Sequence, residues 1–361
     1  MNKDTLFSII NTLSSTANFA DWGAAPLRRL NEQEAYYMQA AERGDFATLD
    51  YLHNNLEKRL NPALLLEEIG VELIQDSSCG IYTNCSILVF LAPFKQKDKI
   101  EEEPESNTCN TIKISKYAWG IDYHYVIKNK LNHIVEQLQE LDPMIKARVF
   151  TDSAPILERA WAVEAKLGFV GKNNFLISRN CGIANFIGLI LVNLPIERVL
   201  NSSKDAHYLA NKDYCGKCQR CLDACPSGAL YSAHKLNADK CISYQTIENK
   251  ELISTSHLEP KLNNWLFGCD ECMDVCPWNS KNLIAWKEFS NKSKGVQLLE
   301  DSNFSIQTIK ELSNLDFKKL FKSSPILRSG KNKIIDTLAY LKKNETSNTS
   351  KPNKGRTENK L

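Results

Sequence analysis

The sequence predicts an α+β protein whose second half carries a dense group of cysteines. Two apolar runs bounded by turn residues, at 86–94 (SILVFLAPF) and 182–192 (GIANFIGLILV), are typical of strands covered on both faces. Between them, residues 123–141 carry apolar side chains at helical spacing, which predicts an amphipathic helix. Eight cysteines fall within residues 215–276. These observations predict a domain of sheet and helices followed by a smaller, metal-bearing domain.

The segments around these elements have weaker patterns. Residues 1–62 place apolar side chains at roughly helical spacing and end at Pro62, so we expect this region to be helical. Residues 95–115 are charged and weakly patterned, which predicts a surface loop. The tail after Asn344 is rich in Asn, Ser, Thr and Lys, and we expect it to be disordered.

A short strand followed by a helix is predicted around Asp152. Residues 148–152 (RVFTD) indicate a strand that delivers Asp152 at its carboxyl end. Residues 155–168 (PILERAWAVEAKLG) predict a helix that opens at its proline and closes at its glycine. By residue type alone, an aspartate at this place is more often a helix cap than a catalyst.

Length and charge suggest two or three domains. The chain has 361 residues and a formal charge of +2. We divide it into an α+β domain at residues 1–204, a cysteine-rich domain at 205–290, and a basic helical extension with a disordered tail at 291–361. Residues 331–361 hold eight Lys or Arg against three acidic residues, a balance that suits a polyanionic partner.

The composition also predicts the compartment and the use of the cysteines. No apolar run of about eighteen residues occurs, and the start lacks a secretion signal, so we expect a cytoplasmic protein without membrane contact. Twelve cysteines in a reducing compartment favour metal ligation over disulfides.

The cysteine spacing predicts two [4Fe–4S] clusters. Residues 215–226 match C-x2-C-x2-C-x3-C-P, in which three thiolates hold one cubane and the fourth cysteine ligates a different cluster. A second set follows at residues 269–277, and Cys241 brings the total to the eight that two cubanes need. We assign the ligands of one cluster as Cys215, Cys218, Cys221 and Cys276. We assign the ligands of the other as Cys225, Cys241, Cys269 and Cys272.

Two structural zinc sites are the alternative, since C-x2-C knuckles are common. Zinc knuckles do not require a crossing cysteine or two Cys-Pro ends, so the iron–sulfur interpretation is favoured. A two-cluster module passes single electrons, and the chemistry must therefore lie in what it feeds. No phosphate-binding glycine motif is present to indicate a nucleotide cofactor.

Four stretches together identify a family. Residues 117–124 (YAWGIDYH), 151–178 (TDSAPILERAWAVEAKLGFVGKNNFLIS), 240–248 (KCISYQTIE) and 268–279 (GCDECMDVCPWN) closely resemble epoxyqueuosine reductase, the QueG family. The resemblance covers roughly residues 20–330 and is more specific than the cysteine spacing, which many ferredoxin-type modules share.

The resemblance implies an enzyme that reduces epoxyqueuosine to queuosine at the wobble position of tRNA, the last step of queuosine biosynthesis. It implies a nitroreductase-like domain that binds cobalamin, followed by a ferredoxin-like domain with the two clusters. The implied partners are tRNA carrying epoxyqueuosine and an external electron donor of flavodoxin or ferredoxin type. We expect a monomer.

The family's proton donor falls on Asp152 in the motif TDSAPILER, where a carboxylic acid can protonate the departing epoxide oxygen. His124 starts a sequence like the cobalamin motif D-x-H-x-x-G but lacks its glycine, so we expect a structural or supporting role there. The resemblance places the cobalamin contacts at Arg59, Asp152, Lys172, Asn173, Asn174 and Ser243.

Two other functions stay open at this point. One is a reductive dehalogenase-like enzyme that uses cobalamin and iron–sulfur clusters on small organic molecules. The other is a ferredoxin-type electron carrier without catalysis of its own, although the long non-cluster domain argues against it.

Overall fold

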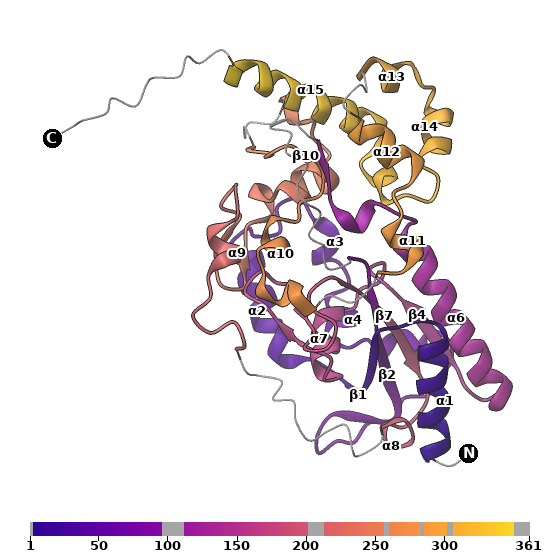
Figure 1. Cartoon of the computed structure of the whole chain (residues 1–361). Coiled ribbons are helices and arrows are strands. Elements are labelled where there is room, and N and C mark those ends of the chain that lie inside the picture. Colours follow the sequence, from indigo (N-terminus) through magenta and orange to yellow (C-terminus); the bar gives the residue numbers. More distant parts are fainter. Residues whose placement is uncertain are drawn as a thin grey trace.

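The computed structural model describes residues 3–95, 112–200, 213–255, 260–281, 285–301 and 306–349, and the structural statements below concern these residues (Figure 1). A four-stranded sheet lies at the centre of the first half of the chain; in this view the cysteine-rich segment lies to one side and the carboxyl-terminal helices lie at the top. In the described ranges, no helix combines the length and the apolar character that a membrane crossing requires.

The central sheet has the order β1-β2-β7-β4, and each neighbouring pair is antiparallel. Its strands are β1 (Asp21–Arg28), β2 (Ile81–Pro93), β7 (Asn185–Val192) and β4 (Ala147–Phe150). The predicted strands at the two long apolar runs are confirmed as β2 and β7. They occupy the middle of the sheet and are buried on both faces, which explains why their sequences are continuously apolar.

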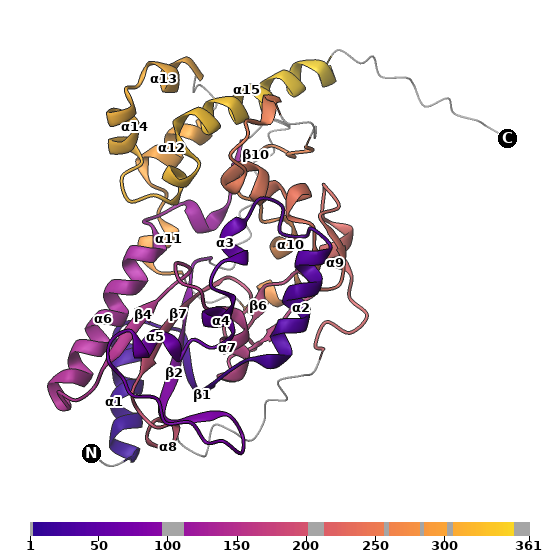
Figure 2. The same cartoon turned by 180° about the vertical axis from the view of Figure 1, so that it is seen from behind.

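Helices cover both faces of this sheet. Helix α6 (Tyr123–Leu141), predicted from its apolar periodicity, packs with α1 (Lys3–Thr16) on one face. Gly188 of β7 lets α6 approach closely, because a Cβ there would lie 2.9 Å from Ile127 Cγ2. Helices α5 (Leu64–Glu67) and α7 (Glu158–Glu164) cover the opposite face (Figure 2).

The prediction that residues 1–62 are all helical is wrong. Strand β1 lies within this region, and only the flanking segments form helices: α1 before it, and α2 (Asn31–Glu42), α3 (Asp50–His53) and α4 (Leu56–Leu60) after it. Pro26 hid the strand, since proline cannot donate a ladder hydrogen bond. Because β1 is an edge strand, it tolerates the proline.

The helix after Asp152 is shorter than predicted. Helix α7 spans Glu158–Glu164, and the segment from Thr151 to Pro155 forms bends. The helix therefore begins after its proline, and Lys166 adopts a left-handed conformation (φ 62°) beyond its end. A hairpin of β5 (Phe169–Val170) and β6 (Leu176–Ile177) follows.

The predicted loop at 95–115 is partly wrong. Its last residues form β3 (Lys113–Ile114), which pairs in parallel with β10 (Trp265–Phe267). Residues 96–111 lie outside the described residues.

The cysteine-rich segment contains short elements only. Helices α9 (Arg220–Asp223) and α10 (Glu271–Asp274) contact each other, and a small hairpin of β8 (Leu230–Ser232) and β9 (Lys235–Leu236) lies between them in the sequence. A π-helix follows at Tyr244–Glu248. The remaining short helices are Lys116–Ala118, Ile196–Val199 (α8), Ala238–Lys240, Ile253–Thr255, Pro277–Lys281 and Pro325–Arg328.

The carboxyl-terminal region is helical, with α11 (Lys287–Ser290), α12 (Lys294–Glu300), α13 (Ile306–Glu311), α14 (Asn314–Leu320) and α15 (Gly330–Thr349) (Figure 2). Its buried side chains share one core with β3, β10 and the π-helix. Helix α15 continues to Thr349, so the prediction of disorder directly after Asn344 is wrong, and residues 350–361 lie outside the described residues. The three-domain division stays a prediction.

Candidate active site and cysteine clusters

The charges of the eight candidate ligand cysteines act on one another in two groups. The pKa of the Cys276 thiol is raised to about 11, first by burial and then by three neighbouring thiolates, those of Cys215, Cys221 and Cys218. The pKa of the Cys272 thiol is raised first by burial and then by the thiolates of Cys269, Cys241, Cys225 and Cys221. The charge of Cys221 thus acts on Cys272 as well as on Cys276. The individual ligand roles stay a prediction.

The two sets are built from a repeated unit. Residues 218–226 and 269–277 both read C-x2-C-x3-C-P, and each unit forms one short helix, α9 or α10. The two helices contact each other, so the cysteines that end the units can cross to the opposite set. This explains structurally why Cys276 is grouped with Cys215 rather than with its neighbours in the sequence.

The turn of the β5-β6 hairpin holds both cysteine units. Lys172 Nζ donates to the carbonyl oxygens of Gly216 and Cys218, at 2.6 and 3.0 Å. Asn173 Nδ2 donates to the carbonyl oxygen of Cys272 at 3.0 Å. Two predicted cobalamin contacts therefore use their side-chain donors to fix the cluster loops.

Asp152 lies in the bend that follows β4. Its side chain is 62% exposed, and its backbone is left-handed with φ at 51°. The Tyr123 hydroxyl donates to Asp152 Oδ2 at 2.5 Å, and His124 Nε2 lies 3.7 Å from the same oxygen. The residue that caps α7 is Leu157, so Asp152 is not the helix cap that its residue type suggested.

Asp122 fixes the start of α6 beneath this carboxyl. Its Oδ1 accepts a hydrogen bond from the His124 backbone N–H at 3.0 Å and lies 2.7 Å from His124 Nδ1. Burial, followed by the charge of Asp152, raises the pKa of the Tyr123 hydroxyl, so this group remains a hydrogen-bond donor at neutral pH. These contacts are compatible with the supporting role predicted for His124, which stays a prediction.

A second carboxyl lies beside Asp152. Glu158, the first residue of α7, accepts a hydrogen bond from the Asp152 backbone N–H at 2.6 Å. Its side chain is partly exposed, yet the surrounding protein raises its pKa to about 8 by desolvation first and by the charge of Asp152 second. Sequence reasoning missed this role, although Glu158 is part of the motif that located Asp152.

The remaining predicted cobalamin contacts have local partners. Arg59 is buried and donates to the backbone oxygens of Tyr51 and Asn54, at 2.6 and 3.3 Å. Asn174 has a left-handed backbone, and its carbonyl oxygen accepts from Arg159. Ser243 offers its backbone N–H to the Cys241 thiolate.

An ion pair from the carboxyl-terminal region also borders the site. Arg328 Nε lies 2.6 Å from Glu248 Oε1, and a second hydrogen bond joins Arg328 Nη2 to Glu248 Oε2 at 2.9 Å. The pKa of Arg328 is raised first by the hydrogen bond to Glu248, and Asp152 contributes to the increase. The side chain of Tyr51 is 48% exposed. Burial is the main cause of the raised pKa of its hydroxyl, and the negative charge of Asp152 adds to the increase. Sequence reasoning gave no signal for this pair.

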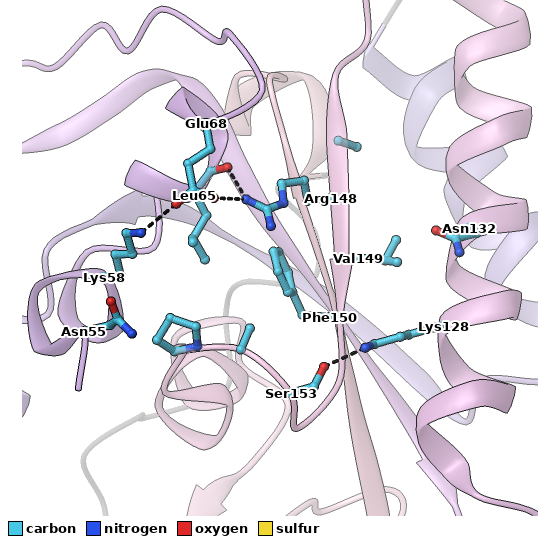
Figure 3. Close-up of a pocket in the computed structure, with 13 residues that line it drawn as sticks. Asn55, Lys58, Leu65, Glu68, Lys128, Asn132, Arg148, Val149, Phe150 and Ser153 are labelled. Atoms are coloured by element: carbon cyan, nitrogen blue, oxygen red, sulfur yellow. Dashed lines mark hydrogen bonds and ion pairs between the residues drawn. The ribbon is translucent and has the colours of Figure 1, made fainter. Parts of the chain in front are cut away.

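A basic hollow adjoins the Asp152 bend (Figure 3). It has a volume of about 540 Å³, and its wall includes three cations, Lys58, Lys128 and Arg148. Glu68 pairs with Lys58 at 2.7 Å and with Arg148 at 2.5 Å, and Lys128 Nζ donates to Ser153 Oγ at 2.6 Å. The hollow therefore has an excess of positive charge next to the bend that carries Asp152.

Comparison with protein families gives two matches. Residues 82–153 match the family described as epoxyqueuosine reductase QueG, DUF1730, and residues 214–279 match the 4Fe-4S double cluster binding domain. The second match covers the residues predicted to hold two cubanes and favours them over zinc sites.

Relatives extend the similarity over nearly the whole chain. The epoxyqueuosine reductase of Cyclobacterium marinum is 34% identical over 321 residues, which are 89% of this chain and 92% of that protein. A solved epoxyqueuosine reductase with an epoxyqueuosine-modified tRNA-Tyr stem loop is 25% identical, with a TM-score of 0.76 over 94% of this chain and 83% of that one. The Bacillus subtilis epoxyqueuosine reductase, described with its catalytic aspartate loop swung out of the active site, has the same fold, at 23% identity and a TM-score of 0.74 over 96% of this chain and 85% of that one. The chain therefore belongs to the epoxyqueuosine reductase family.

Proposed function

We propose that this protein reduces epoxyqueuosine to queuosine in tRNA, with Asp152 as proton donor and with cobalamin supplied with electrons by two [4Fe–4S] clusters. One observation carries the proposal. The exposed Asp152 carboxyl is fixed by Tyr123 in a bend whose neighbouring helix connects to the hairpin that holds both cysteine units. The proposed proton donor is thus connected, through α7 and the hairpin, to the loops that would hold the clusters.

The reaction needs both. Converting an epoxide to an alkene breaks two carbon–oxygen bonds, consumes two electrons and two protons, and releases the oxygen as water. The electrons come from an external donor through the clusters. Asp152 delivers a proton from its carboxyl to the departing oxygen, and the Tyr123 hydroxyl, hydrogen-bonded to Oδ2, fixes the orientation of that carboxyl.

The residues around Asp152 are compatible with cobalamin. The charge of Asp152 acts on Tyr51 and on Arg328, and both side chains are about half exposed, so an aromatic ring and a guanidinium near Asp152 are accessible to an amide-rich corrin. When bound, cobalamin supplies low-valent cobalt as the reductant that meets the substrate.

The six predicted contacts remain our proposed cobalamin contacts. They divide into two groups according to whether their side-chain donors already bind backbone carbonyls. Arg59, Lys172 and Asn173 use part of their donors on backbone carbonyls, so they would touch the cofactor through their remaining N–H groups or their other atoms. Asp152, Asn174 and Ser243 would approach it from the bend, the hairpin turn and the start of the π-helix.

The basic hollow supports a tRNA substrate. RNA backbones bind to clustered Lys and Arg, and such side chains line the hollow, whose wall also includes Ser153, the residue after the proposed donor. The solved relative with a modified tRNA stem loop agrees with such a substrate. The electron donor of flavodoxin or ferredoxin type and the monomeric state belong to the same proposal.

Nucleoside mass analysis tests this function. In tRNA from cells that lack the gene, epoxyqueuosine should accumulate and queuosine should disappear, and expression of the wild-type chain should restore queuosine. Unchanged queuosine in the deletion strain would contradict the proposal.

A further inference from the structure

The backbone of Asp152 adopts a conformation that needs support. At φ 51°, this non-glycine residue occupies the left-handed region, where the Cβ atom crowds the following carbonyl oxygen. Such a conformation persists when the surroundings hold it in place. The Asp152 backbone N–H has such a partner, Glu158 Oε1, at 2.6 Å.

The flanking residues are held from other directions. Thr151 Oγ1 donates to the Ile187 carbonyl oxygen at 2.8 Å, which fixes the bend to the sheet. Ser153 Oγ accepts from Lys128 on α6. Neither contact reaches the Asp152 backbone, whereas the Glu158 carboxyl bonds to it directly.

We propose that Glu158 is a positioning residue, which holds the Asp152 backbone so that the Asp152 carboxyl stays against Tyr123 and faces the substrate. The inference rests on the proposed role of Asp152 as proton donor. In this arrangement, Tyr123 fixes the tip of the side chain and Glu158 fixes its base. A donor held at both ends keeps its position during the reaction.

The surroundings of Glu158 suit this task. Asp152 is its acidic neighbour, and Arg159 and Lys128 are the cations that face it. With a pKa of about 8, Glu158 is largely uncharged at neutral pH, and a carboxyl oxygen accepts the Asp152 N–H in either protonation state. The bond therefore does not place a second full charge beside the proton donor.

Substitutions can separate positioning from proton supply. Glu158→Gln keeps an oxygen acceptor without an ionisable proton, whereas Glu158→Ala removes the acceptor. Glu164→Ala is the matched control, because Glu164 lies on the same helix but pairs with Arg28 at 3.2 Å. Each variant is compared with the wild type as holoenzyme in turnover of epoxyqueuosine-containing tRNA.

Positioning predicts a defined pattern. Glu158→Ala should lower kcat by roughly tenfold or more while KM for tRNA stays within about twofold, and Glu158→Gln should restore most of the rate. Adding Glu158→Ala to Asp152→Asn should cause little further loss, because Glu158 acts through Asp152. Glu164→Ala should match the wild type.

A second measurement does not depend on turnover. Hydrogen exchange in the peptide covering residues 151–157 should be about tenfold faster or more in Glu158→Ala than in the wild type or in Glu158→Gln, because the Asp152 amide loses its acceptor. Unchanged exchange together with an unchanged kcat in Glu158→Ala would overturn the inference. An equal loss of kcat in the Gln and Ala variants would also overturn it, since the proton of Glu158 would then matter. A wild-type enzyme that fails to reduce epoxyqueuosine would instead contradict the proposed function, and the exchange result would still test the positioning.

Discussion

Lys172 connects the catalytic half of the chain to the cluster half, so its removal should loosen the cluster loops. Its ammonium donates to the carbonyl oxygens of Gly216 and Cys218, at the start of the cysteine-rich segment, at 2.6 and 3.0 Å. A hydrogen bond from a charged donor is worth about 1.5–3 kcal/mol, and because solvent reaches this pair we assign each bond the ordinary value of about 1 kcal/mol, or about 2 kcal/mol for the two together. Lys172→Met keeps the aliphatic length and removes both bonds. A loss of about 2 kcal/mol makes local opening of the loop about 30-fold more frequent.

Iron release measures this opening. With an excess of ferrous chelator under anaerobic conditions, the clusters of Lys172→Met should lose iron about 30-fold faster than those of the wild type, because release follows the open population. Lys217→Met is the matched control, since Lys217 lies between the two residues whose carbonyls Lys172 binds but its own side chain is exposed. Release rates in Lys172→Met within twofold of the wild type, or an equal acceleration in Lys217→Met, would refute the reasoning.

Three further predictions concern the clusters, Glu158 and the basic hollow. Cys225→Ala should damage the cluster assigned to Cys241 and leave much of the other intact; low-temperature EPR and iron counting that show loss of only the other cluster would contradict the crossing. Glu158 has a pKa of about 8 in the folded state, against an ordinary value of 4.5. Its neutral form therefore contributes fully to folding stability below pH 4.5, and this contribution is lost at about 1.4 kcal/mol per pH unit between pH 4.5 and about pH 8. Anaerobic thermal unfolding should therefore show the advantage of Glu158→Gln over the wild type growing from pH 5 to pH 8, and a constant difference would refute the pKa assignment. Lys58→Ala should weaken tRNA binding and lower the slope of log affinity against log salt by about one; an unchanged slope would exclude the hollow from the RNA contact.

The central elements of the fold could be predicted because their burial is visible in the sequence. Strands β2 and β7 are covered on both faces and read as continuous apolar runs, and α6 carries the apolar period of a helix against a sheet. Strand β1 could not be predicted, since its pairing with β2 is long-range and Pro26 argues against a strand. The start of α7 was misplaced because Pro155 suggested a first helical turn, whereas the chain bends there to present Asp152.

The site residues that belong to sequence motifs could be predicted. The cysteine spacing located both ligand sets, and TDSAPILER located Asp152. The partners of Asp152 depend on contacts between elements: Tyr123 comes from α6 and Glu158 from α7, and their hydrogen bonds exist only after the sheet forms. Arg328 is still more remote in sequence, and its pairing with Glu248 follows from packing of the carboxyl-terminal helices against the π-helix.

Single-turnover reduction of epoxyqueuosine in tRNA by Asp152→Asn tests the central claim most directly. Asparagine nearly preserves the shape and the oxygen that accepts from Tyr123, but it cannot donate the carboxyl proton. The variant should keep its iron content and cobalamin binding and lose roughly a hundredfold or more in rate, the usual contribution of a positioned general acid. Asp142→Asn, at the far end of α6, should behave as the wild type. A rate near that of the wild type in Asp152→Asn would contradict the assignment of Asp152 as the proton donor.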